Sequence, residues 1–376
     1  MWKKKISILL ILTMLAGIVA GCGSGNAENA QATEENKTEE TRIVVDHTGA
    51  EVELPAEIDR VVITSITPLP SVYCLYRGST EGLVGLSPSS MAAAENSYLA
   101  TVYPEIKDIT TEFYTGDEIN LEELMKLEPD VVFYSASKPD EKEMYENAGI
   151  PAVGFSVSLA DYNSVETYVG WIELLSQIYG DDGGKTAEMI ALSRTVESEI
   201  LEKTASLTDA EKPRVLILFN YGNGRIVTSG SKFFGQYWLE TTGAINVASE
   251  LTGQAEINME QIYEWNPDMI FITNFSAVNP EDILSNSIEG ADWSTVKAVQ
   301  EGKVYKFPLG MYRWFPPSSD TPLALMWLAK QIQPEIFDYI DMDAEIKDYF
   351  AKYYQVELTD EDIQTIYNPA REAAGK

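Results

Sequence analysis

The sequence has few of the residues on which most catalytic and metal sites depend. It contains two cysteines, Cys22 and Cys74, and a single histidine, His47. A Ser-His-Asp or Cys-His arrangement would have to use His47, which falls in an expected hairpin turn, far from any expected cleft loop. Direct capture of bare zinc or manganese would need several histidine ligands, so it is disfavoured. We expect no catalytic residue, no metal ligand and no resident cofactor.

Basic residues and long apolar runs are also scarce. Lysine and arginine number 27 against 59 acidic residues, and the net charge of −32 argues against a nucleic-acid partner. The apolar run Ile6–Val19 follows three lysines and is too short for a comfortable membrane span. It ends in Val19-Ala20-Gly21-Cys22, which resembles a bacterial lipobox. The resemblance implies that Cys22 is acylated and anchors the chain on the extracytoplasmic face of the cell membrane.

Composition and pattern divide the chain into five parts. The segment from Gly23 to about Thr41 has almost no large apolar residues and is typical of a flexible tether. Cys74 lies in an apolar helical run, which predicts a small core residue. The predicted parts are a signal peptide (1–21), a tether (22–41), an N-terminal lobe (42–183), a connector helix (184–208) and a C-terminal lobe (209–376).

One stretch of the chain occurs twice. Ile119–Phe133 and Ile257–Phe271 share an Asn, a Glu, a Pro-Asp pair and a Phe in the same register. In each copy the Asn is expected to cap a short helix, Pro-Asp to break it, and the apolar run after it to form a buried strand. Chance recurrence of a common α/β pattern is the alternative, but the shared register favours two related halves.

The rest of the chain alternates strand and helix patterns. Runs such as Arg60–Thr64 and Arg214–Phe219 predict buried strands, and alternation with helices predicts parallel sheets covered on both faces. One long helix between the two repeat copies, from Ala187 to about Leu207, has no strand beside it. We therefore predict an α/β protein with two Rossmann-like lobes, a single connector helix and a ligand cleft between the lobes.

From about Ile43 onward the sequence resembles the substrate-binding lipoproteins of ABC importers for iron–siderophore, haem or cobalamin. Four segments carry the resemblance: Asp46–Val62, Asn120–Val132, Gly243–Ile270 and Trp293–Tyr305. It implies a monomer that binds a chelated metal and delivers it to an ABC permease and its ATPase. Acids that dock on the permease are part of the family pattern. The expected first-lobe position carries none, so Glu81 and Glu240 are the substitutes we consider, with solvated surface charge as the alternative.

A chelate needs aromatic walls and a few cationic side chains, at the carboxyl ends of parallel strands. The loop 310–316 combines aromatics with an arginine; packing of these aromatics into the core is the alternative. The candidate ligand-binding residues are Thr67, Phe113, Tyr114, Ser135, Lys138, Asn220, Tyr221, Arg225, Lys232, Phe233, Asn274, Phe275, Tyr312, Arg313 and Trp314. Iron–siderophore is the first choice of ligand and a corrinoid or haem the second. A lipid-anchored enzyme and a signalling receptor are alternatives of other classes.

Overall fold

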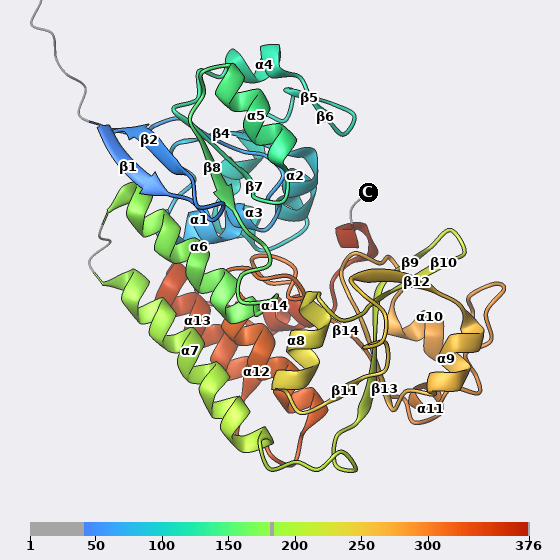
Figure 1. Cartoon of the computed structure of the whole chain (residues 1–376). Helices are drawn as coiled ribbons and strands as arrows, with labels where there is room; N and C mark the ends of the chain where they lie inside the picture. The colour runs from blue at the N-terminus through green and yellow to red at the C-terminus, as the bar shows by residue number, and fades with distance from the viewer. Residues whose placement is uncertain (1–40, 181–183, 375–376) are drawn as a thin grey trace, which may run out of the picture. The chain divides into compact units, whose positions relative to one another are not determined.

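The computed structural model describes residues 41–180 and 184–374 (Figure 1). The predicted signal peptide, Cys22 and nearly all of the predicted tether lie outside the described residues. Residues 40–376 form one compact unit, which contains a separate sheet for each half of the chain. The lobe boundaries predicted from sequence stay a prediction, because the two halves do not separate into independent units.

The N-terminal half holds a hairpin, a four-stranded sheet and a small ribbon. Its strands are β1 (Thr41–Val45), β2 (Glu51–Pro55), β3 (Val61–Ile63), β4 (Leu83–Leu86), β5 (Tyr114–Thr115), β6 (Glu118–Ile119), β7 (Val131–Ser135) and β8 (Ala152–Phe155). Its helices are α1 (Leu69–Arg77), α2 (Pro88–Glu95), α3 (Leu99–Val102), η1 (Pro104–Asp108), α4 (Leu121–Met125), α5 (Pro139–Asn147) and α6 (Ser164–Tyr179). The four-stranded sheet is parallel throughout, in the order β4-β3-β7-β8, as predicted.

The C-terminal half follows a long helix, α7 (Lys185–Thr204), which lies within the predicted connector. Its strands are β9 (Arg214–Gly222), β10 (Arg225–Ser229), β11 (Ile245–Asn246), β12 (Gln254–Ile257), β13 (Met269–Ile272) and β14 (Val304–Lys306). Its helices are α8 (Phe234–Thr241), α9 (Met259–Trp265), α10 (Pro280–Leu284), α11 (Lys297–Gln300), α12 (Thr321–Ile332), α13 (Met342–Tyr354), α14 (Asp360–Tyr367) and η2 (Arg371–Ala374). The prediction of a parallel sheet is wrong for this half: the sheet is mixed, because β10 runs antiparallel to β9 and β12.

The repeated segment builds the same unit in both halves, as the sequence predicted. Asn120 caps α4 by accepting hydrogen bonds from the backbone of Glu122 and Glu123, and Asn258 caps α9 through the backbone of Gln261. The strands that follow, β7 and β13, are fully buried and lie inside their sheets. Each pairs in parallel with the first strand of its own sheet along the chain, β3 or β9.

The Pro-Asp pair has a role that the sequence did not indicate. The Asp130 carboxylate accepts a hydrogen bond from the backbone N–H of Arg60 at 2.8 Å, just before β3. The Asp268 carboxylate does the same for the N–H of Arg214, also at 2.8 Å, at the start of β9. Each aspartate therefore fixes the register at which two neighbouring parallel strands begin.

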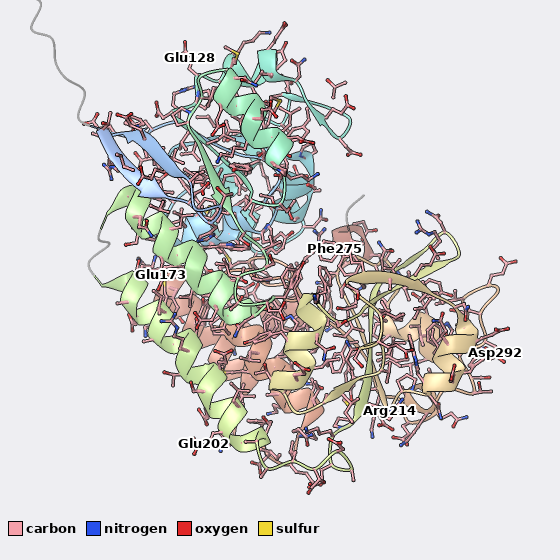
Figure 2. All side chains as sticks on the ribbon, viewed as in Figure 1. Glu128, Glu173, Glu202, Arg214, Phe275 and Asp292 are labelled. Carbon is pink, nitrogen blue, oxygen red and sulfur yellow. The ribbon has the colours of Figure 1, made fainter. Side chains whose placement is uncertain are left out.

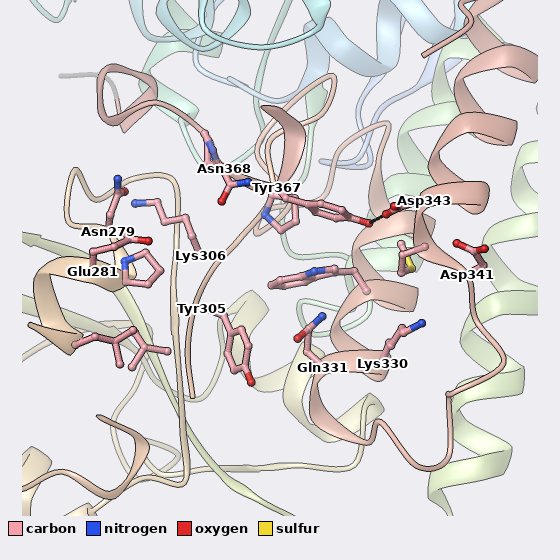
Figure 3. A pocket seen from close by; sticks show the side chains of 17 residues that line it. Asn279, Glu281, Tyr305, Lys306, Lys330, Gln331, Asp341, Asp343, Tyr367 and Asn368 are labelled. Carbon is pink, nitrogen blue, oxygen red and sulfur yellow. Dashed lines mark hydrogen bonds between the residues drawn. The ribbon is translucent and has the colours of Figure 1, made fainter. Parts of the chain in front are cut away.

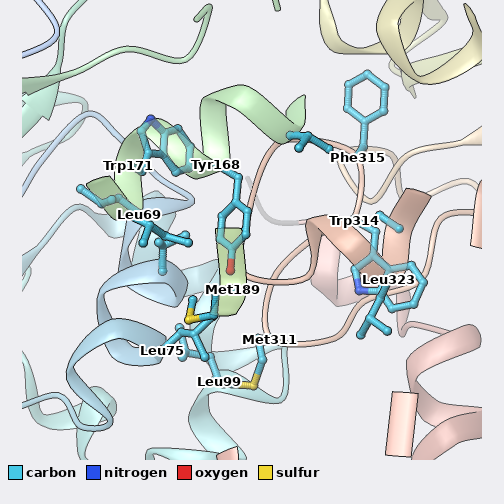
Figure 4. Packing of buried hydrophobic residues seen from close by; sticks show 14 of the residues in the cluster. Leu69, Leu75, Leu99, Tyr168, Trp171, Met189, Met311, Trp314, Phe315 and Leu323 are labelled. Carbon is cyan, nitrogen blue, oxygen red and sulfur yellow. The ribbon is translucent and has the colours of Figure 1, made fainter. Parts of the chain in front are cut away.

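One hydrophobic core is shared by both halves. It joins Leu69 and Trp171 of the N-terminal half to Met311, Trp314 and Leu323 of the C-terminal half, all fully buried (Figure 4). Helices α6, α7 and α12 contact one another and lie side by side (Figure 1). The buried Cys74 belongs to this core, as predicted, and burial raises the pKa of its thiol. Among the described residues no helix combines the length and apolarity needed to cross a membrane.

Candidate functional site

A cavity of about 220 Å³ lies between the two halves of the chain. Six of its fourteen lining residues are aromatic, and no charged side chain lines it. The lining residues are Ser65, Ile66, Thr67, Pro68, Val157, Trp171, Phe219, Phe233, Phe234, Gln254, Phe275, Phe315, Pro316 and Pro317. Apolar walls with a few polar groups are typical of small-molecule sites.

The cavity is placed where parallel strands end. Ser65 and Thr67 follow β3, Val157 follows β8, and Phe275 follows β13. Phe275 points toward the region between the two halves (Figure 2). In α/β folds ligands bind at the carboxyl ends of the strands, and here the carboxyl ends of both sheets contribute to one cavity.

A β-bulge keeps Tyr221 out of this wall, which Phe219 reaches. In the pairing of β9 with β10, Val227 faces Asn220 and Thr228 faces Leu218, so Phe219 has no partner. Before the bulge, Ile217 packs in the core shared by both halves; after it, Tyr221 packs in the second core of the C-terminal half, 6.0 Å from Trp293. A bulge shifts the alternation of side chains by one residue, which is why Phe219 rather than Tyr221 reaches the cavity.

The aromatic residues of the cavity hold one another in place. Phe219 stacks on Phe275 with ring centroids 4.9 Å apart and meets Phe233 edge-on at 5.6 Å. Phe233 packs against Phe234 at 4.8 Å, and Tyr162 covers both of these rings from outside the cavity. Mutual packing fixes the rings before any ligand arrives, so little side-chain entropy is lost on binding.

Arg313 lies directly behind this wall. Its guanidinium carbon is 4.5 Å from the Phe275 ring centroid, and only 4% of the residue is exposed. Nη2 donates to the backbone carbonyls of Ala373 (3.0 Å) and Ala374 (3.2 Å), and Nη1 donates to the Tyr312 hydroxyl at 3.4 Å. Nε has no hydrogen-bond partner, and no carboxylate of the described residues forms an ion pair with Arg313. Among the residues that the structure describes, no counter-charge pairs with this buried cation.

Asp320 holds the loop that carries Arg313. Its Oδ2 accepts hydrogen bonds from the Tyr312 backbone N–H and the Trp314 indole N–H, both at 3.1 Å. Asp320 is fully buried, and burial raises the pKa of its carboxyl to about 7. The loop 310–316 is therefore held by hydrogen bonds to a buried carboxyl group that has no ion-pair partner among the described residues.

Three of the predicted ligand-binding residues line the cavity: Thr67, Phe233 and Phe275. The structure buries Tyr312 and Trp314, and neither lines the cavity. For these two residues the alternative stated above, packing into the core, is the correct one. Phe315 of the same loop does line the cavity. Tyr312 does not line the cavity but contacts a residue that does: its hydroxyl lies 3.3 Å from Oγ1 of Thr67.

The other predicted residues are not brought into the cavity. Phe113, Tyr221 and Asn274 are buried, and Tyr114 packs half-buried against a separate core of the N-terminal half. Arg225 is paired with Glu256 at 2.8 Å, and the Ser135 side chain contacts Ser137. Lys138, Asn220 and Lys232 are exposed and do not line the cavity. The two predicted docking acids, Glu81 and Glu240, are also exposed.

Several lining residues were missed by the sequence analysis. Ser65, Ile66 and Pro68 flank the predicted Thr67, and Phe219 ends a predicted strand, so the strand-end rule could have found them. Trp171 and Phe234 lie on helices and Gln254 on a strand, where sequence periodicity gives no sign of a cavity. These residues reach the site only through tertiary packing.

His47 lies nearer to the cavity than the sequence indicated. Its Nδ1 accepts a hydrogen bond from the backbone N–H of Ser156 at 3.1 Å, beside the lining residue Val157. Burial lowers the pKa of His47, which favours the neutral imidazole that accepts this bond. Within residues 41–180 and 184–374 there is no cluster of three or more His, Cys, Asp or Glu side chains that could hold a metal ion.

A larger hollow of about 690 Å³ lies on the C-terminal half alone (Figure 3). Lysines and acids share its rim, and Tyr305 and Trp327 line it. Lys306 donates to the carbonyls of Ser276 (2.5 Å) and Val278 (2.7 Å), and burial lowers its pKa to about 8. The N-terminal half contributes no group to this hollow, so it is not the cleft that two lobes form between them.

Comparison with known proteins agrees with this fold. Residues 72–309 match the model of the family described as periplasmic binding protein, and the chain belongs to that family. A periplasmic solute binding protein from Veillonella parvula, known from its crystal structure, is 32% identical, with a TM-score of 0.78 over 88% of this chain and 97% of that one.

Two further relatives carry specific names. The iron-uptake system-binding protein of Bacillus subtilis is 26% identical over 317 residues, or 80% of this chain and 90% of that protein. The molybdate-binding protein MolA of Haemophilus influenzae is 24% identical over 330 residues, or 84% of this chain and 91% of that protein. By their names, these relatives are solute-binding proteins and not enzymes.

Proposed function

We propose that this protein captures an iron chelate outside the cytoplasm and delivers it to an ABC permease. The aromatic cavity at the carboxyl ends of both sheets carries the proposal. Its rings offer flat apolar contact to the body of a chelate, and Ser65, Thr67 and Gln254 offer hydrogen bonds to its edges. The iron-uptake relative supports the choice of iron, and the metal is cargo that arrives already chelated.

A corrinoid or haem is the second candidate, favoured by one observation. The wall is rich in aromatic rings and carries no charged side chain, which suits a planar macrocycle better than a small hydrophilic ion. The same observation disfavours bare molybdate, the ligand in the name of the Haemophilus relative. An oxyanion needs several convergent hydrogen-bond donors or cations, and the lining residues supply few.

The proposal includes the anchoring of the protein and its partner. Acylation of Cys22 would hold the protein on the extracytoplasmic face of the cell membrane, and the protein would work there as a monomeric binder without enzymatic turnover. Glu81 and Glu240 are exposed, as acids that dock on a permease must be. A Cys22→Ser variant should move from the membrane fraction to the soluble fraction of its host; retention in the membrane would argue against the acyl anchor.

Ligand binding can be tested by tryptophan fluorescence, because Trp171 lines the cavity. The chain from Asn26 onward is titrated with ferric citrate, a ferric trihydroxamate, a ferric tris-catecholate, haem and cobalamin. The correct ligand should quench the emission in a saturable way, and a Phe233→Ala, Phe275→Ala double variant should bind it at least about tenfold more weakly. Tyr263→Ala removes an exposed aromatic far from the cavity and serves as the control.

Equal affinity in the double variant and the control would exclude the aromatic cavity as the site. Saturable quenching by haem or cobalamin, with none by the three ferric chelates, would replace the first candidate ligand with the second. Conversion of any bound chelate during incubation would contradict a pure binding role.

A further inference from the structure

The C-terminal turn η2 lies across the back of the proposed site. The Arg371 side chain donates to Asp282 through both of its terminal nitrogens, at 2.5 and 2.9 Å, and to the Ala277 carbonyl at 3.0 Å. On its other side, η2 contacts α2 of the N-terminal half. This turn, residues 371–374, is called the strap below because it touches both halves and is tied down by one ion pair.

The strap supplies hydrogen-bond acceptors to the guanidinium of Arg313. Its carbonyls at Ala373 and Ala374 are the acceptors for Nη2, and the Tyr312 hydroxyl is the acceptor for Nη1. Neutral carbonyls are weaker partners for a buried cation than an anionic oxygen is. Burying a cation without an anion is costly, so Arg313 remains poised to accept one.

Arg313 lies one side chain behind the wall that an anion in the cavity would meet. Phe275 lines the cavity and covers the guanidinium, and Thr67 lines the cavity and contacts the Tyr312 hydroxyl. Arg313 is the cation whose guanidinium packs on the ring of a lining residue. Arg313 is therefore a group that can neutralise a negatively charged ligand in a cavity whose own lining has no charge.

The two halves cannot open widely to make room. Besides their common core, the backbone N–H of Tyr98 donates to Gly310 at 2.9 Å, and the Ser97 hydroxyl donates to Met311 at 3.1 Å. The cavity of about 220 Å³ is below the roughly 300–1,000 Å³ that ligand pockets usually have. The additional space must then come from a local movement, and the strap is a short turn whose side-chain anchor is the Arg371–Asp282 ion pair.

We infer that the strap is a displaceable stand-in for the ligand's anionic group. Resting on the proposed function, this inference specifies the ligand as an anionic chelate, with carboxylate or catecholate oxygens at its edge. On binding, an anionic oxygen takes the place of the Ala373 and Ala374 carbonyls on Arg313, and residues 371–374 leave the guanidinium. The Arg371–Asp282 pair is the latch that sets the free-energy cost of this exchange.

The latch is strong enough to hold the turn and weak enough to be released. Its geometry is bidentate, which favours a stable pair. The side chains of Arg371 and Asp282 are nevertheless 49% and 23% exposed, so solvent screens their attraction. A closed strap lowers the apparent affinity for the ligand by about the equilibrium constant for closure. A substitution in the latch that reduces this constant by a given factor should raise the apparent affinity by that factor.

The test compares Arg371→Gln with Arg194→Gln, using ferric citrate as the probe. Arg194 forms a bidentate pair with Glu166 at 2.8 Å, with 46% and 33% of the two side chains exposed, and it lies on α7 away from the strap. Arg371→Gln should bind ferric citrate about 3- to 10-fold more tightly than wild type, while Arg194→Gln stays within about 2-fold. Hydrogen exchange of the peptide covering 371–374 should become faster when wild type is saturated with ferric citrate.

A second variant tests the role of Arg313. Arg313→Gln should lose at least about 10-fold in affinity for ferric citrate and keep its affinity for a ferric trihydroxamate, which has no net negative charge. If this variant does not fold, the latch comparison and the exchange measurement still decide the question.

The outcomes separate the inference from the proposed function. If ferric citrate binds wild type while exchange at 371–374 is unchanged or slower, and the two arginine variants bind it equally, the strap is structural and only the inference fails. If a trihydroxamate binds and ferric citrate does not, the anionic specificity is wrong and the proposed function stands. If no chelate binds wild type or Arg371→Gln, the proposed function fails, and the inference fails with it.

Discussion

Asp320 offers a sharp test of the physical reasoning, because a carboxyl group in its position must resist ionisation. It is fully buried, its Oδ2 accepts two hydrogen bonds, and its Oδ1 has no partner. The titratable groups near it are the tyrosines Tyr168 on α6 and Tyr349 and Tyr354 on α13, and burial raises the pKa of all three. None of them supplies a positive charge that would stabilise a carboxylate. We therefore examine the change Asp320→Asn, which keeps an oxygen acceptor and removes the ionisation.

The sign of the effect follows from the two pKa values. Unfolded aspartate has a pKa near 3.8, and burial raises that of Asp320 to about 7 in the folded protein. Between these values the folded state holds one proton more than the unfolded state, so this group's contribution to stability falls as pH rises. The slope is about 1.4 kcal/mol per pH unit, and the contribution levels off above pH 7.

The assay is urea unfolding of wild type and Asp320→Asn across this pH range. Because the other groups titrate alike in both proteins, the difference between their free energies of unfolding isolates Asp320. Wild type should lose about 1.3 kcal/mol relative to the variant between about pH 5 and pH 6. An Asp117→Asn variant, changed at an exposed position, should track wild type. A constant difference between wild type and Asp320→Asn over this range would refute the reasoning.

Three further predictions concern the frame and the cavity. Asp130→Ala should cost about 1–2 kcal/mol of unfolding free energy, because it removes the acceptor of two backbone N–H groups, those of Asp59 and Arg60; urea unfolding that shows no loss would contradict this role. Gly310→Ala should lower the free energy of unfolding by about 1–3 kcal/mol in the same assay, because the new Cβ would lie 2.6 Å from the Asp320 carboxylate. Unchanged stability would mean that the loop shifts to accommodate the methyl group. Trp171→Phe should keep chelate affinity within about 3-fold and remove much of the fluorescence quenching, because the aromatic wall is kept and the reporter is lost; full quenching would place the ligand elsewhere.

The sequence by itself determined the frame. Capping asparagines, Pro-Asp breaks and apolar runs are local signals, so Asn120 and Asn258 marked both helices and the strands after them. Residues in the loop after a strand directly follow that strand in the sequence, so the apolar runs that predict strands also indicate where these loops lie. Thr67, Phe233 and Phe275 were predicted on this ground. The family resemblance rested on the same local segments, and the match to the periplasmic binding protein family confirmed it.

Tertiary structure alone decided the interior of the site. The bulge that turns Tyr221 away from the cavity depends on the register of β10, and Trp171 reaches the cavity through the packing of α6. The burial of Arg313 depends on residues 371–374, which lie far from it in the sequence. The sequence shows which residue types follow each predicted strand. Only long-range packing decides which of them face the ligand and which side chain the C-terminal turn covers.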